Sequence, residues 1–334
     1  MPPSTVTATE TVTKTLVENH TIVETSTATV TATATRIVLV DALGRSIVLE
    51  KPAERIVTLA PSITEDVCSL GLCSRIVGLD SYSKTVEGVP SNATVVGGYW
   101  NPSPEKIAAL HPDLVLACSG VPYQERMAPQ LEQLGIRVFF LRCDRARDLN
   151  DIYWDLRAVA TLLGRPEAAD KVIEGMRERV ARLEEALANM TRPSVALLVY
   201  LQKNGAWVAG GGTFQDTLVN LAGGTNVFHS LHGWQMVGYE EILSKNPDYI
   251  VVTGMSPADY NRTIALFEST PLKNARAFRE GHVCVLYGEA ANRLNRPSPG
   301  VVDAAYLLAH LLHPDKVEAP AGLAESYHCL GQSG

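Results

Sequence analysis

A long helical pattern occupies the middle of the chain: PEAADKVIEGMRERVARLEEALANM, residues 166–190. Pro166 suits the first turn of a helix, no further proline follows within the pattern, and Gly175 is its only glycine. At a rise of 1.5 Å per residue such a helix reaches ~35 Å, enough to cross a boundary between two lobes. A shorter helical pattern precedes it, with Asp148 as the predicted N-cap and Gly164 as its end. We therefore expect a helical segment over 148–192 that joins two lobes.

Strands and helices alternate on both sides of this segment. Before it, apolar runs such as RIVTLA, RIVGLD and PDLVLA are separated by helical patterns, and after Pro193 the alternation starts again. The helix that opens at PSITE has Ser62 and Thr64 as candidate N-caps. Such alternation predicts an α/β fold with a parallel sheet and helices on its faces. The predicted lobes cover 36–147 and 193–334.

The two predicted lobes share a spacing. Glu105 and Glu240 each stand two residues before an isoleucine and seven residues before a Pro-Asp turn, which opens an apolar strand. This echo favours two lobes of related design, although helix–turn–strand units with a Pro-Asp turn are common.

The first 35 residues differ from the rest in being almost entirely Thr, Val, Ala and Glu. This composition is typical of a Thr-rich stalk or linker that is open to O-glycosylation. The alternative is an extra β-hairpin docked on the body. No signal-peptide pattern precedes the stalk, and we expect the signal or anchor to have been removed. Asn-X-Ser/Thr triplets favour an exported, surface-exposed protein and occur at Asn19, Asn92, Asn189 and Asn261.

The six cysteines do not form a Cys-X-X-Cys pair, so a zinc ribbon or a thioredoxin motif is not expected. An even count fits up to three disulfides in an oxidising compartment. The pairs that we favour are Cys68 with Cys73, across the Gly71 turn, and Cys284 with Cys329. The alternative is that most of the cysteines are free, buried and apolar in character.

Composition and motifs exclude several functions. The net charge of −7 argues against nucleic-acid binding. No G-X-S-X-G or H-E-X-X-H pattern occurs, and GGGT at 210–213 lacks the lysine that a P-loop requires. His229 and His232 could be metal ligands, but no third partner is evident. His310 and His313 are expected on the surface at a helix end. We expect no catalysis, no resident cofactor and no metal site.

The remaining signal is aromatic. Tryptophan and tyrosine residues fall at predicted strand ends or loops, where rigid rings can contact a large ligand. They are Tyr82, Tyr99, Trp100, Trp207 and Trp234. The fourth tryptophan, Trp154, lies inside a helical pattern and is expected in the core.

Four segments together resemble the substrate-binding proteins of ABC importers for vitamin B12 and ferric siderophores: RIVTLAPSITEDVCSLGL with RIVGLDSYS, VGGYWNPSPEKIAALHPDLVLA, GYEEILSKNPDYIVVTG and NRPSPGVVDAAYLLAHLL. The resemblance runs from Ile37 to about His313 and leaves the stalk outside. It implies two Rossmann-like lobes bridged by the 166–190 helix, little hinge closure, ligand capture between the lobes and delivery to a transmembrane permease. We also expect a monomer that is tethered by the stalk to the outer face of the cell membrane, or periplasmic.

The resemblance assigns roles to individual residues. Tyr82, Tyr99, Trp207 and Trp234 match pocket aromatics of the B12 receptors, with Trp100 adjacent to the match. Arg296 matches a cleft arginine, and Glu289, Asn292 and Arg293 lie in the same loop. One glutamate per lobe is expected to dock on permease arginines. The match falls on Glu65 and Glu240, each expected in the first turn of a helix, with Glu105 and Glu241 as alternatives.

The sequence does not decide between the possible classes of ligand. A corrinoid is large, flat and mostly uncharged, and several loop aromatics favour it. A ferric siderophore or haem is the alternative, because Arg293 and Arg296 could serve an anionic chelate. An oxyanion receptor, or a cofactor-handling enzyme on the same two-lobe design, are further alternatives.

Overall fold

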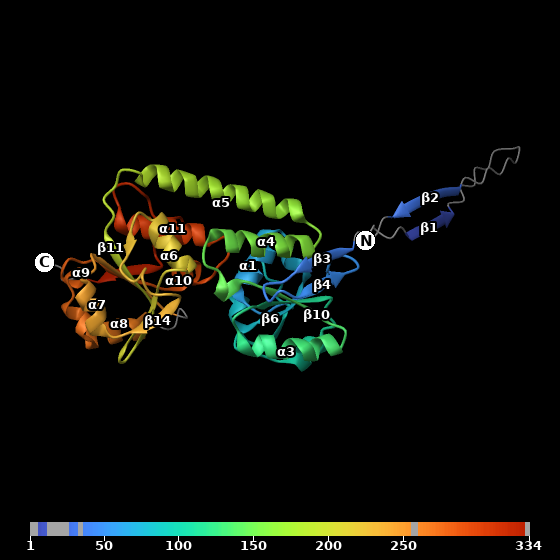
Figure 1. Cartoon of the computed structure of the whole chain (residues 1–334), viewed down its shortest axis with the longest axis horizontal. Helices are drawn as coiled ribbons and strands as arrows, with labels where there is room; N and C mark the ends of the chain where they lie inside the picture. Colours follow the sequence, from blue (N-terminus) through green and yellow to red (C-terminus); the bar gives the residue numbers. More distant parts are fainter. Residues whose placement is uncertain (1–5, 12–26, 33–35, 255–259, 331–334) are drawn as a thin grey trace, which may run out of the picture.

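The computed structural model describes residues 6–11, 27–32, 36–254 and 260–330. The body consists of two α/β lobes that lie side by side, with one long helix running along both (Figure 1). None of the helices in the described ranges combines the length and the apolar character that crossing a lipid bilayer requires.

The N-terminal lobe is built on a six-stranded sheet with the order β10-β9-β5-β6-β7-β8. All neighbouring pairs are parallel except the short β7–β8 pair. The strands are β5 (Ile56–Thr58), β6 (Ile76–Asp80), β7 (Thr94–Gly98), β8 (Asn101–Pro102), β9 (Leu114–Cys118) and β10 (Arg137–Leu141). Strand β9 is buried throughout because helices cover both faces of the sheet. These helices are α1 (Pro61–Ser69), α2 (Pro104–Ala109), α3 (Pro122–Gln133) and α4 (Leu149–Leu162).

A hairpin precedes this sheet and packs on its core. It consists of β3 (Ile37–Val40) and β4 (Ser46–Leu49), which pair antiparallel. Helix α1 begins differently from the prediction. Its N-cap is Ala60 and Pro61 is its first residue, so Ser62 and Thr64 lie inside the helix and cap nothing. The proline fixes the start because its missing N–H suits the first helical position.

The C-terminal lobe has a seven-stranded sheet with the order β14-β12-β11-β15-β16-β17, and β13 pairs with β11. Its centre is parallel, whereas β12, β14 and β17 run antiparallel to their neighbours. The strands are β11 (Ser194–Gln202), β12 (Gly205–Ala209), β13 (Thr225–Asn226), β14 (Trp234–Val237), β15 (Tyr249–Thr253), β16 (Val283–Leu286) and β17 (Tyr327–Leu330). The helices are α6 (Phe214–Leu221), α7 (Tyr239–Lys245), α8 (Tyr260–Ser269), α9 (Arg276–Arg279), α10 (Gly288–Asn295) and α11 (Val301–Leu312).

Helix α5 (Pro166–Leu187) confirms the predicted bridge and ends three residues before the predicted Met190. It packs on α4 at the N-terminal lobe and on α11 and α6 at the C-terminal lobe (Figure 1). Arg179, in its middle, pairs with Asp303 of α11 at 2.5 Å. The predicted N-cap Asp148 is also confirmed, because its carboxylate accepts bonds from the N–H groups of Asn150 and Asp151.

Three disulfides join the six cysteines. Both favoured pairs are confirmed, Cys68–Cys73 and Cys284–Cys329. The third bond, Cys118–Cys143, links the end of β9 to the turn that follows β10. The alternative of free buried thiols is therefore wrong.

The Thr-rich segment contains one pairing. Strands β1 (Val6–Thr11) and β2 (Thr27–Ala32) form a two-stranded antiparallel ribbon. This agrees with the hairpin part of the alternative reading. Asn19 lies outside the described residues.

Candidate ligand-binding site

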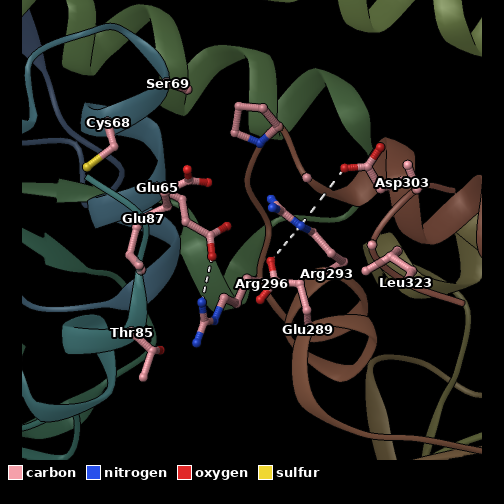
Figure 2. Close-up of a pocket in the computed structure, with 15 residues that line it drawn as sticks. Glu65, Cys68, Ser69, Thr85, Glu87, Glu289, Arg293, Arg296, Asp303 and Leu323 are labelled. Atoms are coloured by element: carbon pink, nitrogen blue, oxygen red, sulfur yellow. Dashed lines mark hydrogen bonds and ion pairs between the residues drawn. The ribbon is translucent and has the colours of Figure 1, made fainter. Parts of the chain in front are cut away.

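A cavity of about 660 Å³ opens between the lobes. From the N-terminal lobe it is lined by α1 and by the turn after the 3₁₀ helix η2 (Ser81–Thr85). From the C-terminal lobe it is lined by α10, the loop that follows α10 and the start of α11 (Figure 2). Three of the predicted ligand residues line it, namely Glu289, Arg293 and Arg296.

An ion pair crosses this cavity and joins the lobes. The Arg296 guanidinium lies 2.6 Å from Glu65 Oε1, and the Ser298 hydroxyl donates to Glu65 Oε2 at 2.5 Å (Figure 2). The side chains of Arg296 and Glu65 are only 12% and 11% exposed. Glu65 was expected as an exposed docking residue in the first turn of its helix. The expected first-turn position and exposure are wrong, because Glu65 is the fifth residue of α1 and its side chain, paired with Arg296 of the other lobe, is only 11% exposed.

The second cleft arginine is also paired. Arg293 Nε lies 2.8 Å from Glu289, one turn earlier in α10, and 3.9 Å from Asp303. Asn292 donates to the other oxygen of Glu289 at 3.1 Å. With Glu65 and Glu87, the cavity presents four carboxylates against two guanidinium groups. The two cleft arginines are thus paired with carboxylates of the cavity, which carries a negative excess.

The N-terminal aromatics lie beside the carboxyl ends of the strands, outside this cavity. The Tyr99 hydroxyl donates to Asp144 Oδ2 at 2.5 Å, and Trp100 packs edge-on against Tyr99 with ring centroids 4.7 Å apart. Burial, and then the charge of Asp144, raise the pKa of Tyr99 well above its usual range. Asp80, at the end of β6, is buried and its pKa is raised by that burial. Tyr82, two residues on, is half exposed.

Asp80 connects the two parts of the site. The charge of Arg296 partly offsets the raised pKa of Asp80, and the charge of Asp80 contributes to the raised pKa of Tyr99. Asp80 therefore interacts electrostatically with Arg296 on one side and with Tyr99 on the other. The buried interlobe pair and the Tyr99 ring thus belong to one region between the lobes.

The C-terminal aromatics share one face of a β-ribbon. In the β12–β14 register, Trp207 stands opposite Met236 and Ala209 stands opposite Trp234. Residues two apart on a strand, and directly opposite residues, lie on the same face. Trp207 and Met236 are 38% and 41% exposed, whereas Trp234 packs partly on the core. Sequence reasoning missed Met236, whose only signal is its spacing of two from Trp234.

Glu105 occupies the same place in the N-terminal lobe that Glu240 occupies in the C-terminal lobe, as their shared spacing from the Pro-Asp turn predicts. Both are exposed and lie in the first turn of a helix, α2 for Glu105 and α7 for Glu240. The pKa of Glu105 is lowered by its own backbone N–H and by the Ser103 hydroxyl. Each helix is followed by a residue with φ near +45°, His111 after α2 and Asn246 after α7, which lies directly before the Pro-Asp turn.

The aspartates of the two Pro-Asp turns make equivalent hydrogen bonds. Asp113 Oδ2 accepts from the backbone N–H of Arg55 at 2.9 Å, just before β5 begins. Asp248 Oδ2 accepts from the backbone N–H of Ser194 at 2.7 Å, where β11 begins. The echo in the sequence is therefore a repeated structural unit, with Glu105 and Glu240 in equivalent places.

Comparison with known proteins agrees with this architecture. Residues 56–290 match the family described as periplasmic binding protein. The cobalamin-binding protein of Halobacterium salinarum is 29% identical over 283 residues, which cover 82% of this chain and 73% of that protein. A periplasmic heme binding protein from Pseudomonas aeruginosa superposes with a TM-score of 0.70 and 26% identity, over 79% of this chain and 94% of that one. The periplasmic vitamin B12 binding protein of Vibrio cholerae gives a TM-score of 0.60 and 25% identity, over 78% and 97%.

The matched segment extends from the first strand of the N-terminal sheet, through α5, into α10 of the C-terminal lobe. It thus contains both sheets' central strands and seven of the fifteen residues that line the interlobe cavity. The chain belongs to the periplasmic binding protein family.

Proposed function

We propose that the chain is the extracytoplasmic receptor of an ABC importer, that it captures a corrinoid such as cobalamin between its lobes, and that it delivers this ligand to a transmembrane permease. The family and the cobalamin-binding relative support this assignment. Three disulfides support an oxidising location outside the cytoplasm. The proposed role includes no catalysis.

The observation that carries the choice of ligand is the pairing of both cleft arginines with carboxylates. An anionic ferric siderophore would have to displace Glu65 from Arg296, or Glu289 from Arg293, and would meet the negative excess of the cavity. Displacing Glu65 would leave a carboxylate that is only 11% exposed without its partner, which is costly. A mostly uncharged, flat macrocycle meets no such cost and can contact the exposed rings of Tyr82, Trp100 and Trp207.

Binding can be tested directly. Thermal shifts would be measured with cyanocobalamin, a ferric hydroxamate, haemin and molybdate. A ligand at 100 times its Kd stabilises the folded state by about 2.7 kcal/mol. We expect this with cyanocobalamin and not with the ferric hydroxamate. Stabilisation by haemin or by the siderophore alone would overturn the choice of corrinoid.

The aromatic contact can be tested in the same assay. Trp207→Ala should weaken cyanocobalamin binding by about 1–3 kcal/mol, the scale of an aromatic contact removed from water. Leu134→Ala is the control, because it removes an exposed apolar side chain at the C-cap of α3, which does not line the cavity. Equal affinities for the two variants would remove Trp207 from the site.

For permease docking, we propose the pair Glu105 and Glu240 in place of Glu65 and Glu240. The repeated helix–turn–strand unit places one exposed carboxylate on each lobe, which suits a permease with two-fold symmetry. Rim carboxylates of this kind steer encounter and set register with a basic partner.

A further inference from the structure

The loop 227–233 of the C-terminal lobe carries an oriented histidine. His229 Nδ1 lies 2.9 Å from Asp216 Oδ2, while the imidazole is 75% exposed and the carboxylate only 13%. In the neutral imidazole, a carboxylate partner at Nδ1 favours the tautomer with the proton on Nδ1, and this tautomer leaves the lone pair on Nε2. The ring orientation of a metal-binding histidine is commonly fixed by a carboxylate that accepts a hydrogen bond from the ring nitrogen that does not bind the metal.

Asp216 is itself held by a buried amide. The Asn226 side chain is 8% exposed and donates both to Asp216 Oδ1 and to the backbone oxygen of Ala209, each at 2.8 Å. Asp216 also lies in the first turn of α6, where its N–H donates to the Thr213 hydroxyl at 3.2 Å. His229 is therefore the exposed end of a hydrogen-bond network that runs through Asp216 to the buried side chain of Asn226.

The glycines of the GGGT motif hold the loop close to β12. A Cβ added at Gly211 would lie 2.3 Å from the backbone oxygen of His229, and one at Gly210 would lie 2.7 Å from that of Leu231. Gly210 and Gly211 also exchange backbone hydrogen bonds with Gly233 at 2.9 and 3.0 Å. The motif thus seats the His229 loop and does not form a phosphate cradle.

The network lies at the boundary between the lobes. Thr217, next to Asp216, donates through its hydroxyl to the backbone oxygen of Arg147 at 3.3 Å, at the end of the N-terminal lobe. Asp144, three residues before Arg147, is the residue that accepts from Tyr99. Trp234 follows the His229 loop directly. The His229 loop is therefore anchored on α6, which contacts the N-terminal lobe, and it leads directly into Trp234.

A single oriented imidazole suits a metal that is already held by a macrocycle. Among the described residues no group of three His, Cys, Asp or Glu side chains could hold a free ion. A chelated metal with one exchangeable axial position needs only one ligand from the protein. On the basis of the proposed function, we infer that His229 Nε2 binds the cobalt of a corrinoid. In this step the cobalt–water bond of the aquo form breaks, a cobalt–nitrogen bond forms, water leaves, and no electron is transferred.

Absorption spectra test the inference. Aquocobalamin would be titrated into the full chain, into His229→Ala and into His232→Ala. His232 is the matched control, because it is exposed on the same loop and has no carboxylate partner within the part of the chain that the structure describes. We expect the wild type and His232→Ala to shift the visible bands to those of cobalamin in excess imidazole, with one cobalamin per chain. His229→Ala should leave the aquo spectrum unshifted.

Two further measurements distinguish a failure of this inference from a failure of the proposed function. Cyanocobalamin keeps its cyanide, so its binding reports whether each variant still has an intact cleft. Asp216→Asn should weaken aquocobalamin binding by roughly tenfold, the usual effect of losing such a carboxylate. An aquo spectrum unchanged on saturating the wild type, or equal shifts with both histidine variants, would overturn the role of His229. If neither cobalamin binds to the wild type, the proposed function and this inference both fail.

Discussion

Removal of the Glu65 carboxylate should destabilise the chain strongly, because that carboxylate holds the lobes together from within. The variant Glu65→Ala leaves the Arg296 guanidinium, 12% exposed, without its partner at 2.6 Å. Breaking one side of a buried ion pair costs about 3–5 kcal/mol. The buried Ser298 hydroxyl also loses its acceptor, which alone costs about 1–3 kcal/mol and partly overlaps with the first cost. We expect a loss of about 4 kcal/mol in the free energy of unfolding.

The assay is urea unfolding followed by circular dichroism with the disulfides intact. The matched control is Glu50→Ala, which breaks a pair with Arg36 at 3.2 Å whose side chains are 78% and 54% exposed. Exposed pairs of this kind contribute less than about 1 kcal/mol. If the two variants differ from the wild type by the same amount, Glu65 and Arg296 do not form a buried interlobe pair in solution and the geometry argued above is refuted.

Three other variants probe features that the fold brings together. Burial raises the pKa of Asp155 from 3.8 to about 7, so between these values the folded chain holds a proton that the unfolded chain has released. The free energy of unfolding should therefore fall by at most about 4 kcal/mol as pH rises from about 4 to 7. Denaturation at several pH values should show that the free energy of unfolding of Asp155→Asn depends less steeply on pH over this range. Arg179→Pro, in the middle of α5, should cost about 3 kcal/mol or more, and small-angle scattering should show altered lobe separation. Glu105→Arg with Glu240→Arg should abolish permease binding at low salt while leaving cyanocobalamin affinity unchanged; retention of permease binding would remove this pair from docking.

The elements that local chemistry specifies could be predicted from the sequence. Pro166, the absence of another proline and the helical pattern are enough to place α5. Asp148 caps α4 because its carboxylate reaches N–H groups two and three residues away. Cys68 and Cys73 are five residues apart across a glycine turn, so their pairing needs little knowledge of the fold.

Features that depend on contacts between distant segments could not be predicted in this way. Glu65 and Arg296 are 231 residues apart, and only the packing of α1 against the other lobe brings them together. The spacing around PSITE made Glu65 resemble an exposed residue near a helix start, whereas Pro61 places that start earlier. The Cys118–Cys143 bond did have a signal. Each of these cysteines ends or closely follows an apolar strand, and neighbouring parallel strands bring such positions together.

The repeated unit explains how two lobes can present a fixed pair of carboxylates. In each lobe the aspartate of the Pro-Asp turn is bonded to the start of the adjacent strand, so the preceding helix and its glutamate are fixed relative to the sheet. The separation of Glu105 and Glu240 then depends only on how the lobes sit relative to each other. Helix α5, through Arg179 and Asp303, and the Glu65–Arg296 pair set that relation. A change that loosens the Glu65–Arg296 pair is therefore expected to alter the spacing of Glu105 and Glu240, the two carboxylates that we propose for docking.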